Sequence, residues 1–243
     1  MNRPLLVLFS LCLALTGFAQ PDAPERTFRI FSVGGTFDDL RFDPAPGRNA
    51  LKLLVAPSPS ESHPAPASGK LVLYRELPMP ADAPPGAKPK QEEAVRVDIP
   101  SGWNRSLIII AAAPERRFTA KVINDDFEKH PAGVLRALNF SSFQAGLRLN
   151  QDTHLIDMGD EALLPFSSGA VLVQVAVGKE GKWELILSRE RATAPRRHSY
   201  LFIFDNTPPP PGAGGEAAAQ TSSRPAFVNY FTEPVPVPDE STR

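Results

Sequence analysis

The sequence has almost no cysteine: its 243 residues include one, Cys12. Cys12 lies in an N-terminal leader that we expect to be removed, so the mature chain would contain none. A mature chain without cysteine excludes a disulfide framework, thiol catalysis and metal sites with thiolate ligands. We therefore expect a protein held together by its core alone, and we predict no cofactor.

An excess of basic charge is also missing. The chain has 26 Lys and Arg against 27 Asp and Glu, and the leader contributes one Arg and no acidic residue. Binding to a phosphate backbone requires a basic excess on some face of the protein. The near-neutral balance therefore argues against nucleic acid as a partner.

The leader carries the firmest prediction. A positive charge at Arg3 precedes the apolar run Leu5–Phe18, and Gly17 and Ala19 place small residues before Gln20. This order is typical of a secretory signal peptide, with cleavage near Ala19. A 14-residue run spans only about 21 Å as a helix, less than the roughly 30 Å hydrocarbon core of a bilayer. No later run is apolar enough to be a transmembrane segment, so we expect a periplasmic or extracellular protein.

Helix signals are few, and proline is abundant, at 27 residues. Proline interrupts helices and sheet interiors alike, so its clusters mark loops and a tail. Between the clusters, short apolar or alternating runs recur at the spacing of an all-β protein. Ala94–Ile99 alternates strictly, whereas Leu107–Ile110 and Leu201–Phe204 are apolar on both faces, as in strands buried on two sides. The pattern predicts an antiparallel β-sandwich.

The turn-like segment Asn124–Ala132 separates two sets of strands. We favour two sandwiches in tandem, and one larger sandwich remains the alternative. The predicted divisions of the chain are a signal peptide at 1–19, an N-terminal extension at 20–27, the first sandwich at 28–125, a linker at 126–133, the second sandwich at 134–206, and a disordered Pro/Gly/Ala-rich tail at 207–243. Residues 226–232 (AFVNYFT) are unusually aromatic for such a tail and are predicted to dock as an edge strand or to bind a partner.

The second half carries a resemblance to a known fold. The succession VLRALNFSS, GLRL, ALLPFSSGAVLVQVAV and WELILSRERATAPRRHSYLFIF resembles immunoglobulin-like domains of exported bacterial proteins. The chain as a whole is similar to uncharacterised secreted proteins of Gram-negative bacteria of the verrucomicrobial kind. The resemblance implies an immunoglobulin-like sandwich, and it implies no catalytic residue.

Catalytic signatures are missing as well. The chain contains no Gly-x-Ser-x-Gly motif and no phosphate-binding or dinucleotide fingerprint. Its four histidines are isolated in sequence, so we expect them at the surface rather than around a metal. We therefore predict no catalytic residues.

Weak binding candidates remain. Asp157, Asp160 and Glu161 surround Gly159 and form the best calcium candidate, although a solvated hairpin turn explains them equally simply. Another candidate is Trp103, an aromatic residue after a turn. The basic run Arg189, Arg191, Arg196 and Arg197 suits anionic polymers or lipid headgroups. The last candidates are the aromatic residues of the tail, Phe227, Tyr230 and Phe231.

Three functional hypotheses stay open at this stage. The first is an exported, non-enzymatic β-sandwich protein with a binding or structural role in the periplasm or cell envelope, with an envelope protein or a glycan as partner. The second is a carbohydrate-active or other hydrolytic protein whose carboxylates converge only in three dimensions. The third is a subunit of an envelope assembly that uses the aromatic tail to contact another chain.

Overall fold

The computed structural model describes residues 25–44, 50–84, 86–113, 117–166, 169–194, 196–206 and 224–235. Sixteen β-strands in four sheets of four form this part of the chain, and it contains no helix. No helix that could cross a membrane is therefore found among these residues. The all-β prediction is confirmed, and the arrangement is consistent with a β-sandwich. The predicted signal peptide, residues 20–24 of the predicted extension, and residues 207–223 and 236–243 of the predicted tail lie outside the described residues.

Eight strands belong to residues 27–124. They are β1 (Thr27–Val33), β2 (Phe37–Phe42), β3 (Leu51–Val55), β4 (His63–Pro64), β5 (Lys70–Glu76), β6 (Gln91–Asp98), β7 (Arg105–Ala112) and β8 (Phe118–Asn124). They form two sheets, in the orders β3-β2-β5-β6 and β4-β1-β7-β8.

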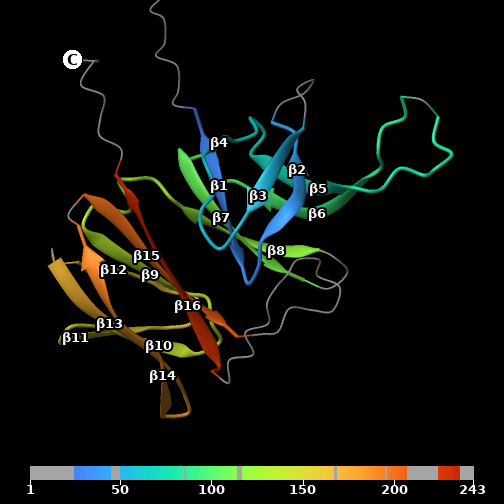
Figure 1. Ribbon diagram of the computed structural model, residues 1–243. Coiled ribbons are helices and arrows are strands. Elements are labelled where there is room, and N and C mark those ends of the chain that lie inside the picture. The colour runs from blue at the N-terminus through green and yellow to red at the C-terminus, as the bar shows by residue number, and fades with distance from the viewer. Residues whose placement is uncertain are drawn as a thin grey trace, which may run out of the picture.

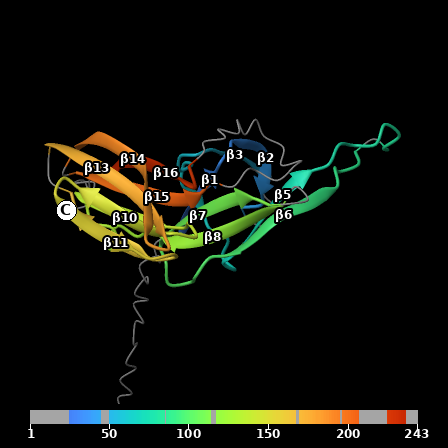
Figure 2. The ribbon, with the colours of Figure 1, turned by 90° about the horizontal axis from the view of Figure 1, so that it is seen from below.

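The other eight strands belong to residues 134–234. They are β9 (Val134–Asn139), β10 (Gln144–Leu149), β11 (Asp152–Ile156), β12 (Glu161–Pro165), β13 (Gly169–Lys179), β14 (Lys182–Thr193), β15 (Arg197–Asp205) and β16 (Ala226–Pro234). Their two sheets have the orders β12-β9-β15-β16 and β11-β10-β13-β14. Figure 1 shows the two groups of strands side by side, and Figure 2 shows the same division from below.

Two strand pairings depart from the expected antiparallel pattern: β1 pairs with β7 in parallel, and so does β9 with β15. In each case the chain passes through another sheet between the two strands, which gives it room to return in the same direction. The remaining pairings between strands are antiparallel.

Three buried apolar clusters lie between the four sheets. The first core is shared by β3-β2-β5-β6 and β4-β1-β7-β8, and the second core by the two sheets of residues 134–234. A middle core joins the facing sheets of the two groups through residues such as Phe31, Leu107, Tyr200 and Phe202. The two groups of strands are therefore packed against each other through a continuous apolar contact.

The runs predicted to be buried on both faces are the strands that separate these cores. In Leu107–Ile110 alternate residues face the middle core and the first core, and in Leu201–Phe204 they face the second core and the middle core. Side chains of a strand alternate between its two faces, so a strand between two cores must be apolar at every position. This part of the prediction is confirmed.

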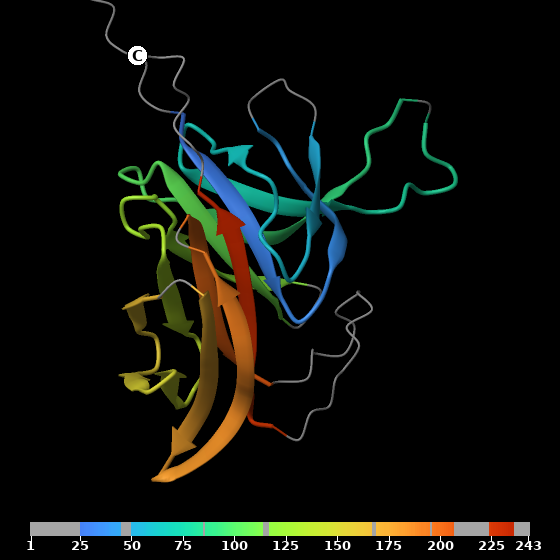
Figure 3. The ribbon, with the colours of Figure 1, turned by 60° about the vertical axis from the view of Figure 1, so that its left-hand side comes forward.

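The aromatic tail segment forms β16, which pairs with β15 along its whole length, from Arg197↔Pro234 to Asp205↔Ala226. Phe227 and Phe231 pack against the middle core, whereas Val228 and Tyr230 pack against the second core. Figure 3 shows β16 in red beside β1 in blue, at the junction of the two groups of strands. One strand from the end of the chain thus contributes to two cores.

Candidate functional site

The facing sheets β4-β1-β7-β8 and β12-β9-β15-β16 meet in an interface with a charged end and an open end. The charged end centres on Arg29 of β1, whose side chain is 9% exposed. Its Nη2 lies 2.6 Å from Oδ2 of Asp125 and donates a hydrogen bond to Oε1 of Glu233 at 3.0 Å, while its Nη1 also pairs with Glu233. One guanidinium therefore pairs with two carboxylates from distant parts of the chain.

Further groups complete this interlayer charge cluster, which we define as Arg29, Arg105, Asp125, His130, His198, Tyr200 and Glu233. The Tyr200 hydroxyl donates to Oδ1 of Asp125 at 2.6 Å, and Arg105 Nη2 donates to Oδ2 of the same carboxylate at 3.3 Å. Asp125 is fully buried, and each of its two oxygens accepts at least one hydrogen bond. A buried carboxylate is stable only when it is paired in this way.

Two stacked histidines extend the cluster. The rings of His130 and His198 lie 4.8 Å apart, and His130 Nε2 lies 3.0 Å from the carbonyl oxygen of Val134. His198 Nδ1 lies 3.7 Å from Oε1 of Glu233. His130, His198 and also His63 are buried, so the prediction of surface histidines is wrong for these three. Strands β4 and β15 and the turn after β8 carry them into the interior, which no local sequence pattern indicates.

The protonation of the cluster follows from burial and charge. Burial alone would raise the pKa of Glu233, but His198, Arg29 and Arg105 outweigh it and lower the pKa to about 2. Burial lowers the pKa of His130 to about 4. Burial, with help from the carboxylates of Asp125 and Glu233, raises the pKa of Tyr200. At neutral pH, Glu233 is therefore ionised, His130 is neutral and Tyr200 keeps its proton.

This arrangement bears on hydrolytic chemistry. Glycoside hydrolysis requires two carboxyl groups near one bond, one of which keeps a proton through a raised pKa. Asp125 and Glu233 do converge, but both carboxylates bind the same guanidinium, and the pKa of Glu233 is lowered. The cluster therefore joins the two sheets through ion pairs that share one guanidinium.

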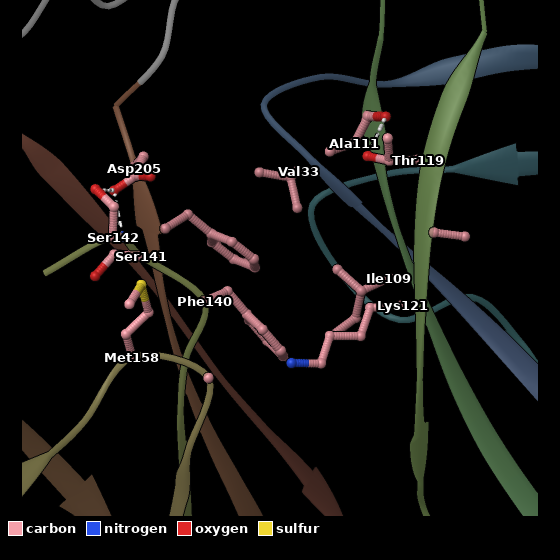
Figure 4. Close-up of a pocket in the computed structure, with 13 residues that line it drawn as sticks. Val33, Ile109, Ala111, Thr119, Lys121, Phe140, Ser141, Ser142, Met158 and Asp205 are labelled. Atoms are coloured by element: carbon pink, nitrogen blue, oxygen red, sulfur yellow. Dashed lines mark hydrogen bonds between the residues drawn. The ribbon is translucent and has the colours of Figure 1, made fainter.

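The open end of the same interface is a cleft of about 480 Å³. Its walls come from β1, β7 and β8 on one side and from the ends of β9 and β15 on the other (Figure 4). The rings of Phe140 and Phe204 stack 5.3 Å apart, and the Lys121 ammonium lies 4.6 Å from the centre of the Phe140 ring. Figure 4 shows the Lys121 side chain directed across the cleft toward Phe140. Asp205 accepts hydrogen bonds from the backbone N–H and the hydroxyl of Ser142 at 2.9 and 3.1 Å.

This interlayer cleft is mainly apolar and carries a cation. Val33, Ile109, Ala111 and Met158 line it together with the two phenylalanine rings. Ligand pockets are typically concave, apolar and supplied with a few polar groups, in a volume of about 300–1,000 Å³. The cleft therefore suits an apolar group of a ligand, with the charges of Lys121 and Asp205 at its walls.

The calcium candidates flank Met158 and Gly159, which line the open end of the interface, but Asp157, Asp160 and Glu161 do not line the cleft themselves. Asp157 and Asp160 are exposed, Asp157 accepts a hydrogen bond from Gln144 at 2.6 Å, and Glu161 pairs with Arg136 at 2.6 Å. Among the residues described by the structure, no group of three or more His, Cys, Asp or Glu side chains could hold a metal ion. The solvated-turn interpretation of these residues agrees with their exposure.

The other sequence candidates are dispersed. Trp103 is half-buried, and its carbonyl oxygen accepts a hydrogen bond from Arg26. Arg189 and Arg196 are exposed, whereas Arg191 lies 4.7 Å from the Tyr230 ring and Arg197 binds Thr232, so the basic run is not one continuous patch. The tail aromatics Phe227, Tyr230 and Phe231 pack against the cores as part of β16.

No sequence signal marked Arg29 or Glu233, which are 204 positions apart and meet through the packing of two sheets against each other.

Comparison with known proteins adds nothing to this geometry: no family model matches the chain, and no curated protein matches it.

Proposed function

We propose that the chain is an exported, non-enzymatic binding module of the cell envelope, built from two immunoglobulin-like sandwiches in tandem, with the interlayer cleft as its binding site. The separate first and second cores support the tandem arrangement. The observation that carries the functional proposal is the difference between the two ends of the interface. At one end, Arg29 binds the carboxylates of Asp125 and Glu233. At the other end lies an open apolar cleft with Lys121, which forms no ion pair with any of the described residues.

Two observations bear on the competing hypotheses. The convergence of Asp125 and Glu233 favours a hydrolase, but their shared guanidinium and the lowered pKa of Glu233 oppose it. An assembly that buries the tail aromatics against another chain would compete with their packing in this chain, where Phe227 and Phe231 contact the middle core and Tyr230 the second core. We therefore place the binding module ahead of both alternatives.

Export is tested by N-terminal sequencing of the protein recovered from cells. The proposal expects a chain that begins at Gln20 and is recovered from the periplasm or the medium. A full-length chain retained in the cytoplasm would contradict it.

Binding in the cleft is tested by affinity capture from envelope extracts with the mature chain. Thr119 lines the cleft and is exposed, so Thr119→Trp should fill the space without entering a core. Lys182→Trp, at the exposed start of β14, is the matched control. The proposal expects molecules that the wild type and Lys182→Trp retain and Thr119→Trp does not. Identical capture by all three, or hydrolysis of chromogenic glycosides and esters that Glu233→Gln abolishes, would overturn it.

A further inference from the structure

A second concave surface lies on the opposite side of residues 134–234, on the outer face of the sheet β11-β10-β13-β14. Strand register places Leu155, Gly146, Ala176 and Leu185 in one row across the four strands. Because Gly146 and Ala176 are small and the leucines at the two ends are large, the row is hollow in the middle. The hollow has a volume of about 270 Å³, and we call it the outer-face hollow.

Trp183 forms one wall of this hollow, and the backbone holds it in place. Gly178, its partner in the strand register, has no side chain, and a Cβ there would lie 2.8 Å from the indole ring. A Cβ on Gly146 would lie 3.2 Å from the same ring. The indole therefore lies against two bare stretches of backbone, while 48% of the residue stays exposed to solvent.

Polar groups share the hollow with the indole. Arg148, Thr153 and Gln174 line it. Arg148 Nε donates to the carbonyl oxygen of Asn150 at 2.9 Å, which fixes the side chain at one end. Among the residues that the structure describes, no carboxylate pairs with the Arg148 guanidinium. An oriented cation without an internal partner is suited to an external anion.

We propose that the outer-face hollow binds a sugar ring that carries a carboxylate, as in an acidic polysaccharide. A pyranose ring has an apolar face of C–H groups, which stacks on an exposed indole, and a polar rim, which requires hydrogen-bonding side chains beside it. The guanidinium of Arg148 supplies paired donors for the carboxylate. An acyl chain or an apolar peptide would not use Arg148, Thr153 or Gln174.

This site extends the proposed function, because it is separate from the interlayer cleft and does not depend on it. Loss of cleft binding in Thr119→Trp would leave sugar binding unchanged. Failure of one proposal is therefore distinguishable from failure of the other.

Isothermal titration of the mature chain tests the proposal, with a hexamer of mannuronate as the acidic probe and cellohexaose as the neutral one. Trp183→Ala should abolish binding of the acidic hexamer. Gly178→Ala, which keeps the indole but displaces it, should weaken binding at least fivefold. Arg148→Gln should weaken binding of the acidic hexamer about tenfold, as expected for loss of one charge-assisted contact.

Arg189→Gln is the matched control for charge. Arg189 is the register partner of buried Val173 and so lies on the opposite face of the same sheet. The variant Arg189→Gln should bind the acidic hexamer like the wild type. Circular dichroism checks that each variant is folded.

Three results would overturn the proposal. The first is a folded wild type that does not bind the acidic hexamer. The second is equal affinity for the acidic and neutral hexamers, which would remove the role of Arg148. The third is a protein that binds no sugar but binds phosphatidylcholine vesicles, and loses that binding in Trp183→Ala. This result would assign the surface to lipid.

Discussion

Removal of Arg29 should destabilise the protein by about 3 kcal/mol, because it leaves buried carboxylates without their main partner. Arg29→Met keeps most of the volume and the apolar contacts of the side chain and removes the charge. Asp125 is fully buried and would retain the Tyr200 hydroxyl at 2.6 Å and Arg105 at 3.3 Å. Breaking a buried ion pair typically costs about 3–5 kcal/mol, and the two remaining donors place this case at the lower end. The folded-to-unfolded ratio would fall roughly a hundredfold.

The assay is urea unfolding at pH 7, followed by circular dichroism, with Arg96→Met as the matched control. Arg96 pairs with Glu93 at 2.6 Å at the exposed surface, where solvent screens the pair, so its loss should change the stability little. A triple variant, Arg29→Met with Asp125→Asn and Glu233→Gln, should recover part of the lost stability, because no buried carboxylate is then left without a partner. The reasoning is refuted if Arg29→Met costs no more than Arg96→Met, or if the triple variant is less stable than the single one.

Acid should destabilise the wild type in two windows, because both His130 and Glu233 bind protons less readily when folded. As the pH falls, the protonation of His130 should lower the free energy of unfolding between about pH 6.5 and 4, and that of Glu233 between about pH 4.5 and 2. Urea titrations at successive pH values measure both windows. His130→Phe should remove the first window, and Glu233→Gln the second. Phe231→Ala removes a ring stacked 4.6 Å from Tyr200 and should cost about 2–4 kcal/mol in urea unfolding; a loss below 1 kcal/mol would show that β16 is dispensable. Gly69→Ala should lower the melting temperature, because Gly69 has φ +71° and a Cβ would lie 2.8 Å from the carbonyl oxygen of Ile99; an unchanged value would contradict this.

Much of the β-structure could be predicted from local pattern. Within the predicted range Ala94–Ile99, Val95, Val97 and Ile99 are buried while Arg96 and Asp98 are exposed, as predicted. Ala94 departs from the alternation: it is buried too, at a shift in the register with β5. Glu180 and Gly181 connect β13 and β14 as a hairpin, and both have positive φ. These features depend on neighbouring residues, so a single sequence contains the information needed to predict them.

The middle core and the interlayer charge cluster could not be predicted in the same way. Arg29 and Glu233 are far apart in the chain, and their contact depends on the packing of two sheets rather than on any local period. The histidines illustrate the same limit: His130 precedes Pro131 in a polar segment that reads as an exposed loop, yet its ring is buried between His198 and Tyr200. Trp183 stands at the start of a strand-like run, but the two glycines against which its ring lies come from β10 and β13.

The central claim is that Asp125 and Glu233 form structural ion pairs with Arg29 and do not act together as an acid–base pair. The most direct test is the titration of the Glu233 carboxyl carbon by nuclear magnetic resonance in the folded protein. The account predicts a pKa of about 2, so that Glu233 remains ionised throughout the range in which a hydrolase would work. A Glu233 pKa between about 5 and 7 would identify a proton donor of the kind that glycoside hydrolysis requires, and would contradict the account.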